Sequence, residues 1–289
     1  MTGGRRARWA LGSPLFAYLA ALVAFPLGYT VWISFHSLVV QQATSRYVGV
    51  LNYRLVLTDP AFWGAMWFTL RFTLVVTALE LVLGTLLALL FDRVFPGKRA
   101  LFSVMLVPIM TAPALMGVAF ELMLNGDIGV VPYFLAKLGL NVSLFSPQAV
   151  EPMLMGIDIL QWTPFVFLVV YSGLQTVPSE LYEAAEVDGA SYWRSVRSVV
   201  FPLLKPIILI GVFIRAINAF RTFDVIYILT GGGPGTLTTT ASIYVYKQAF
   251  SSGEFGEAAS ASLVIAVLLL PLLPLLVPRI VDAQLRARA

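Results

Sequence analysis

The stretch EAAEVDGASYWRSVRSVVFPLLKP, residues 183–206, interrupts an otherwise apolar chain. Its first six residues include Glu183, Glu186 and Asp188, although the chain is 59% hydrophobic and only 12% charged. Soluble domains carry about 25% charged residues, so this chain has too little polar surface to cover a soluble globule of its size. The composition therefore predicts an all-α, polytopic membrane protein with a single transmembrane domain, residues 1–289, in which this stretch forms a polar loop.

Six segments are long and apolar enough to cross a hydrocarbon core of about 30 Å. They are residues 11–35, 66–91, 100–124, 152–174, 202–229 and 258–278. The first apolar run follows three arginines, but it is longer than the core of a signal peptide, so we interpret it as the first span. The polar stretch then lies in the loop between the fourth and fifth spans.

Basic residues predict which loops face the cytoplasm, because short cytoplasmic loops carry an excess of Lys and Arg. With a cytoplasmic N-terminus, twelve basic residues fall on inside segments and four on outside loops. The inside residues are Arg5, Arg6, Arg8, Arg93, Lys98, Arg99, Arg194, Arg197, Lys205, Arg279, Arg286 and Arg288, and the outside residues are Arg46, Arg54, Lys137 and Lys247. We therefore expect both termini and the loop around 183–206 to be cytoplasmic.

Several kinds of chemistry are excluded by residues that the sequence lacks. There is no cysteine and only one histidine, His36, so a disulfide framework, a thiol nucleophile and a histidine-rich metal site are not possible. His36 is expected at the membrane interface, at the end of the first span. Because the basic residues are scattered over the span ends and form no patch, nucleic acid is not an expected partner.

The sequence also lacks a nucleotide-binding loop and a catalytic set. The glycine-rich run 231–235, GGGPG, is not followed by the lysine of a phosphate-binding loop, so we interpret it as an external turn. No nucleophile, base and acid occur in a plausible arrangement, and no catalytic or metal-binding residues are assigned. The chain is therefore not expected to be an enzyme.

The polar loop itself is predicted to contain two short helices. Ser179 is the expected N-cap of the first, which runs to about Asp188, and Gly189 offers a left-handed stop. A second helix through Val199 would precede the fifth span, which Pro202 opens together with Pro206.

Residue types in this loop fit a docking surface. Ala184 and Ala185 would let a partner approach the backbone closely, and four larger residues could anchor it: Tyr182, Val187, Tyr192 and Trp193. From composition alone, an ordinary solvated loop is an equally good interpretation.

A resemblance to a known family bears on this choice. The pattern EAA-x-x-DGA, followed by FPLLKP, closely resembles the EAA loop of importer-type ABC permeases, the binding-protein-dependent transport proteins. The residues at the positions of that motif are Glu183, Ala184, Ala185, Asp188, Gly189, Ala190, Pro202 and Pro206. Two longer stretches, LQTVPSELYEAAEVDGA (174–190) and FRTFDVIYILTGGGPGTLTTT (220–240), look like the sugar-importer branch, and the second resembles its MalF-like subunit.

This resemblance implies a function and a set of partners. The chain would be a permease subunit in a bacterial or archaeal cell membrane, and the loop at about 175–201 would dock on a cytoplasmic ATPase. Its partners would be a second, non-identical permease, two ATPase subunits, an extracytoplasmic solute-binding protein and membrane lipid. No cofactor is expected in this chain, because ATP and Mg would be bound by the ATPase partner.

Polar residues inside the spans are candidates for a solute path, because ionisable groups are costly there. In the fourth and fifth predicted spans they fall on helical faces with i, i+3, i+4, i+7 spacing. The candidates are Asp158, Gln161, Trp162, Phe165, Arg215, Asn218, Ala219 and Thr222. Carboxylates and amides can hold hydroxyls and an aromatic ring can cover a sugar, although such residues can also bond helices to one another.

Four further charged residues in the spans are weaker candidates. Arg221 and Asp224 have i, i+3 spacing and are expected to form a structural pair. Glu80 could line the path or bond to another helix, and Glu121 is a further possibility.

Other functions stay open at this point. A secondary transporter would also carry charges in its spans, but would usually show internal repeats and more spans. A scaffold with a docking loop would not explain the aligned polar faces. A sugar is the favoured solute, and an anionic solute, such as a glycerol phosphodiester, is the alternative because of Arg215 and Arg221.

Overall fold

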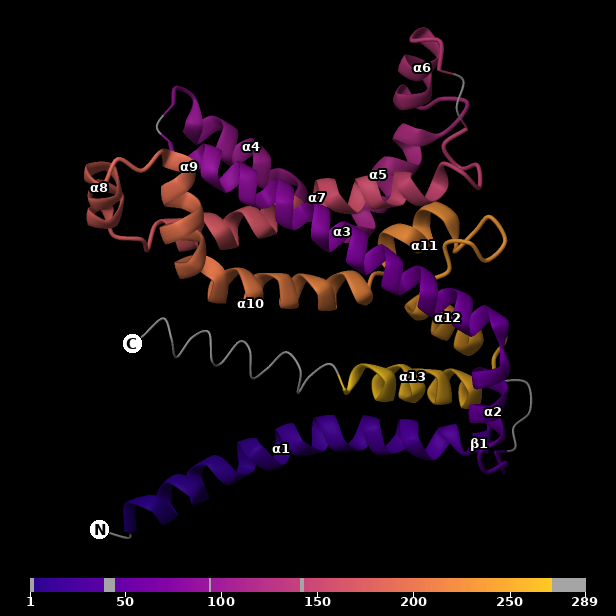
Figure 1. Cartoon of the computed structure of the whole chain (residues 1–289). Coiled ribbons are helices and arrows are strands. Elements are labelled where there is room, and N and C mark those ends of the chain that lie inside the picture. The colour runs from indigo at the N-terminus through magenta and orange to yellow at the C-terminus, as the bar shows by residue number, and fades with distance from the viewer. Residues whose placement is uncertain (1–2, 39–44, 94, 141–142, 272–289) are drawn as a thin grey trace. The chain divides into compact units, whose positions relative to one another are not determined.

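The computed structural model describes residues 3–38, 45–93, 95–140 and 143–271, and helices dominate throughout (Figure 1). The chain divides into two compact units. The first contains the residues up to Trp63 together with Tyr244–Leu270, and the second contains Gly64–Ile243. The all-α class predicted from composition is confirmed.

In the first unit, one long helix packs with two shorter helices. Helix α1 (Gly3–Ser34) leads into a small antiparallel pair, β1 (His36–Ser37) with β2 (Arg46–Tyr47), and then α2 (Leu51–Thr58). Helix α13 (Phe255–Leu269), which follows the π-helical turn η2 (Lys247–Ser251), contacts both α1 and α2.

One buried amide closes the end of α1. Asn52 Nδ2 donates to the carbonyl oxygens of Ser34 at 2.8 Å and His36 at 3.0 Å, so carbonyls beyond the helical ladder find a donor. The His36 ring stacks on Trp32 with ring centroids 4.1 Å apart. His36 therefore lies just beyond the last turn of α1, as its place in the sequence predicted.

The second unit holds most of the long helices and the polar loop (Figure 1). In chain order its elements are α3 (Pro60–Asp92, which begins in the first unit), α4 (Lys98–Met110), α5 (Pro113–Leu124), α6 (Val130–Lys137), α7 (Val150–Leu174), α8 (Ser179–Val187), α9 (Tyr192–Ser195), the π-helical turn η1 (Val196–Val200), α10 (Phe201–Phe220), α11 (Asp224–Thr230) and the start of α12 (Ala241–Tyr246). Its core has two clusters, one around Phe72, Leu154 and Ile226, the other around Phe167 and Leu204.

Helix lengths agree with most of the predicted spans. Ser13–Ser34, Pro60–Asp92, Val150–Leu174 and Tyr192–Thr230 are long and apolar enough to cross a membrane, and α4 with α5 would make a fifth. Helix α13 covers the start of the sixth predicted span, 258–278, and the part of that span from residue 272 onward lies outside the described residues. The count of six spans therefore stays a prediction.

The third span is not the continuous helix that we predicted for residues 100–124. Helices α4 and α5 meet at a bend of 98°, with Thr111 and Ala112 between them. Ala112 has φ −59° and ψ 137°, the extended conformation favoured before a proline, and Pro113 takes the first position of α5. The Ala112–Pro113 pair was the sequence signal for this break.

The fifth span also differs from its prediction, at both ends. Its N-terminal end is continuous with α9 through η1, so no separate second loop helix exists and Pro202 lies within a running helix. Toward its C-terminal end α10 stops at Phe220, and α11 begins only at Asp224.

Because of the break after Phe220, Arg221 and Asp224 do not share a helix, and among the described residues they form no ion pair. The predicted pair was wrong. Carbonyl oxygens at the break accept hydrogen bonds from hydroxyls instead, Thr222 O from Thr240 Oγ1 at 3.2 Å and Arg221 O from Ser242 Oγ at 3.4 Å. Such donors come from residues about twenty positions away, so the local sequence did not reveal the break.

Candidate functional site

The EAA residues form an exposed helix in the loop between α7 and α10. Glu183, Ala184, Glu186 and Asp188 are exposed on or directly after α8. None of their carboxylates forms an ion pair among the described residues. The loop therefore presents its acidic and small residues outward, and no described residue compensates its charges.

Backbone hydrogen bonds fix the end of α8 at the predicted glycine. Gly189 has φ 73°, its N–H donates to Glu186 O at 2.9 Å, and Ala190 N–H donates to Ala185 O at 2.9 Å. This is the Schellman arrangement, which needs a left-handed residue after the helix, so the predicted stop at Gly189 is confirmed. The predicted N-cap was one residue late, because Pro178 occupies that position and makes no side-chain cap.

The four apolar residues of the loop divide into two pairs. Tyr182 and Tyr192 pack against the chain's own core cluster, and the Arg93 guanidinium lies 4.4 Å from the centroid of the Tyr192 ring. Burial, helped by Asp92 and Tyr192, raises the pKa of Tyr182 to about 12. Val187 and Trp193 are instead 88% and 62% exposed. Only this second pair faces outward, so the two tyrosines anchor the loop to the rest of the chain and not to a partner.

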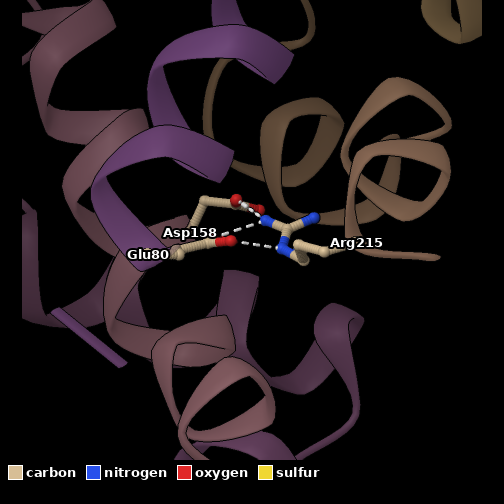
Figure 2. A network of polar contacts seen from close by, with 3 residues as sticks. All are labelled: Glu80, Asp158 and Arg215. Atoms are coloured by element: carbon tan, nitrogen blue, oxygen red, sulfur yellow. Dashed lines mark hydrogen bonds and ion pairs between the residues drawn. The ribbon is translucent and has the colours of Figure 1, made fainter. Parts of the chain in front are cut away.

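A second polar region lies deep between α3, α7 and α10 (Figure 2). Arg215, only 1% exposed, donates through Nε to Glu80 Oε2 at 2.5 Å and through Nη2 to Glu80 Oε1 at 2.8 Å. Nη2 also donates to Asp158 Oδ2. One guanidinium thus joins carboxylates from two other helices. Glu80, which the sequence analysis ranked among the four weaker candidates, accepts two hydrogen bonds from Arg215 and is a main member of this buried group.

Glycines one turn away from two of these charges let the helices approach closely. A Cβ added to Gly84, four residues after Glu80, would lie 2.8 Å from the Phe167 backbone nitrogen on α7. A Cβ added to Gly211, four residues before Arg215, would lie 2.8 Å from Val169 Cγ1. Small residues bring membrane helices together in this way, and the spacing of Gly84 from Glu80 was a signal that the sequence offered.

The remaining polar residues of α7 lie next to this buried group. Gln161 is 1% exposed, and its Nε2 donates to Thr111 O at 3.1 Å, while its Oε1 has no partner. The Trp162 ring centroid lies 5.1 Å from the Arg215 Cζ atom, and Phe165 meets Trp162 edge-on. The structure therefore brings Asp158 and Trp162 to Arg215, whereas Gln161 reaches the break between α4 and α5.

The residues predicted to share one face of α10 differ in burial and position. Asn218 is half-buried, and no described residue forms a hydrogen bond with its amide. Ala219 is fully buried in the apolar core, and Thr222 lies beyond the end of the helix. Glu121 is exposed on α5, away from this group.

The sequence analysis missed the Glu80–Arg215–Asp158 contacts and also an ion pair elsewhere on α3. Arg71 on α3 bonds to Glu151 at the start of α7, with Nη2 and Oε2 2.5 Å apart and the two side chains 41% and 18% exposed. The two residues are eighty positions apart, so no local pattern linked them.

Known proteins resemble this chain over most of its length. Residues 80–287 match the family model described as the binding-protein-dependent transport system inner membrane component. A trehalose/maltose transport system permease protein of Thermococcus litoralis is 34% identical over 259 residues, 89% of this chain and 88% of that protein. A sulfoquinovosyl glycerol transport system permease protein of Agrobacterium fabrum is 32% identical, over 92% of this chain and 87% of that protein.

A solved structure resembles the fold to a similar extent. It is a bacterial alginate ABC transporter in complex with an alginate pentasaccharide-bound periplasmic protein. Its matching chain gives a TM-score of 0.80 at 21% identity, over 96% of this chain and 92% of that chain.

Proposed function

This chain belongs to the family of binding-protein-dependent transport system inner membrane components, and from that membership we propose that it is one permease subunit of an ATP-driven sugar importer. ATP and Mg are bound by separate cytoplasmic ATPase subunits. A second, related permease completes the path, and an extracytoplasmic binding protein delivers the solute. Residues 1–289 act as a single permease domain with both termini in the cytoplasm, as the distribution of basic residues favours.

The exposed α8 is the observation that carries this proposal. Its residues Glu183, Ala184 and Ala185, with Asp188 to Ala190 after it, form the docking surface for an ATPase subunit. What supports this role is that the acidic side chains stand free while Tyr182 and Tyr192 hold the loop on the core. Free carboxylates and small residues favour a partner that supplies basic groups and approaches closely.

A neutral, hydroxyl-rich solute is favoured over an anionic one. The name of the Thermococcus litoralis relative refers to trehalose and maltose, whereas the alginate of the solved transporter is acidic and the Agrobacterium fabrum relative is named for a sulfonated solute. In this chain Arg215 is buried and already held by Glu80 and Asp158. A guanidinium that is already bonded to two carboxylates offers little attraction to an anion, because its own acidic partners occupy it.

Within the path, side chains that this chain leaves free are the best candidates for direct contact. The Asn218 amide meets this condition most fully. Trp162 is half-buried and already contacts Arg215 and Phe165, so it would offer only the rest of its ring. Thr222 lies four residues after Asn218. Asp158 and Arg215 contribute indirectly, because their ion pair fixes the helices that carry these side chains, and Ala219 contributes by its small size. Gln161 Oε1 is a further free acceptor.

Assembly provides the test. The tagged chain, expressed with its neighbouring genes, is expected to co-purify with a non-identical permease and two copies of an ATPase subunit, identified by mass spectrometry. Glu183→Lys is expected to release the ATPase while the chain still inserts in the membrane. A stable homodimer that takes up solute without a second permease would overturn the proposal.

A further inference from the structure

The bond between Gln161 and Thr111 joins α7 to the sharpest break in a predicted span. Thr111 lies between α4 and α5, so its carbonyl oxygen has no place in the hydrogen-bond ladder of either helix. Inside a membrane such a carbonyl needs another donor, because no water is present to satisfy it. Gln161 Nε2, at 3.1 Å, is the side-chain donor that reaches it.

The amide oxygen of Gln161 indicates that the bond from its nitrogen to Thr111 is the reason for a polar side chain here. Gln161 Oε1 is buried and has no partner, an arrangement that an apolar side chain of similar length would avoid. A glutamine that only filled space at this position would be unfavourable. A glutamine at this position is explained if its donor to Thr111 is needed.

We propose that Gln161 is a positioning residue that holds the 98° bend between α4 and α5, and that it links this bend to the position of α7 during transport. The same α7 face carries Asp158, which ties α7 to α10 through Arg215. Movement of α7 against α10 is therefore transmitted to the bend through one side chain. This inference rests on the proposed function, since it concerns a step in solute transport.

Distance measurements across the bend test the proposal directly. The chain has no cysteine, so Val104→Cys and Leu122→Cys, at positions 70% and 60% exposed on α4 and α5, give a unique pair of spin labels. In the complete importer complex, Gln161→Met removes the donor while keeping the length of the side chain. The loss of one hydrogen bond is expected to raise the population of a second distance about fivefold.

Thr111→Val is the matched control. It removes the Thr111 hydroxyl, which bonds to Val107 O, but leaves the carbonyl that accepts from Gln161. The distance distribution of this variant is expected to match that of the unmodified chain. Should Gln161→Met fold poorly, Gln161→Asn keeps an amide that is one methylene too short to reach Thr111, and it is expected to broaden the distribution in the same way.

Hydrolysis of ATP by the complex without solute gives a second readout, which a merely structural role would not raise. Release of the bend is expected to increase it severalfold in Gln161→Met and not in Thr111→Val. An unchanged distance distribution in both Gln161 variants would overturn the inference, as would equal broadening in Thr111→Val. A complex that never couples ATP hydrolysis to a solute-loaded binding protein would instead count against the proposed function, while the distances would still decide the role of Gln161.

Discussion

The second unit contains two groups of acidic residues, one buried and paired with an arginine and the other exposed and unpaired among the described residues. Glu80 and Asp158 are buried between long helices, and both are bound by Arg215. Glu183 and Asp188 are exposed on the α8 loop, and no cation among the described residues pairs with them. The first group satisfies its charges internally and so can hold helices together. The second leaves its charges open, which suits a surface that another protein completes.

The largest expected effect comes from removing the cation of the buried group. Arg215→Met leaves two buried carboxylates without a partner, and breaking such a group typically costs about 3–5 kcal/mol. We expect little folded protein by detergent size-exclusion profiles. Arg71→Met is the control, because its ion pair with Glu151 is partly exposed and is worth at most about 1 kcal/mol.

Simultaneous replacement of the buried charges sharpens this test. A chain with Glu80→Met, Asp158→Leu and Arg215→Met has no stranded charge and is expected to recover folded protein, since apolar substitutes for a buried ion group are often neutral or stabilising. If Arg215→Met alone folds as well as Arg71→Met, the buried group does not hold these helices together.

A smaller effect is expected where a side chain beside the buried group is free to meet the solute. Asn218→Ala should lower the apparent affinity for solute roughly five- to 150-fold, the equivalent of about 1–3 kcal/mol for an unpaired polar group. Trp162→Ala should act in the same direction through lost ring contact. Uptake is measured per folded molecule at varied solute concentration.

Trp67→Ala is the control for this pair, because Trp67 is 64% exposed on α3. It should leave the affinity unchanged. Normal uptake by both Asn218→Ala and Trp162→Ala would place the solute elsewhere in the path.

Substitution at the end of α8 is expected to affect coupling more than folding. Gly189 has φ 73° and Gly139 has φ 77°, and neither has an atom near the position of an added Cβ. An aspartate at either position adds the same backbone strain of roughly 1–2 kcal/mol. Gly189→Asp should abolish solute-stimulated ATP hydrolysis, and Gly139→Asp should not. Equal loss in both variants would mean that strain, and not docking, explains the defect.

The smallest expected effect concerns Tyr182, at the boundary between the two groups. Its pKa in the folded chain, about 12, lies above the ordinary value of 10.0, so its neutral form stabilises the fold. That stabilisation is complete below pH 10 and is lost as the pH rises through the folded pKa. The difference in ultraviolet absorbance between the chain and Tyr182→Phe should show Tyr182 mostly protonated at pH 10. A midpoint at 10 would mean that the tyrosine is not held against the core.

Sequence patterns predicted the exposed acidic residues of the α8 loop better than the buried group around Arg215. The loop motif predicted a helix, a stop at Gly189 and an exposed surface, because each depends on residues within about ten positions. The spacing on α7 correctly placed Asp158, Gln161 and Trp162 on one face, yet it could not identify Glu80 as the partner of Arg215, 135 residues away. The break before Pro113 was readable and was missed, whereas the break after Phe220 depends on Thr240 and Ser242.

The sequence by itself determined that this protein is a helical membrane permease with an exposed EAA-type loop, because apolar length, charge distribution and the loop motif are all local properties. Tertiary structure decided which polar residues are free and which are bound. The Arg215 guanidinium, which the sequence offered to an anionic solute, is bonded to two carboxylates from distant helices, and the Gln161 amide nitrogen is bonded to Thr111, which leaves only its oxygen for a solute. Burial makes every polar group seek a partner, and only the packing of helices decides which partner is near.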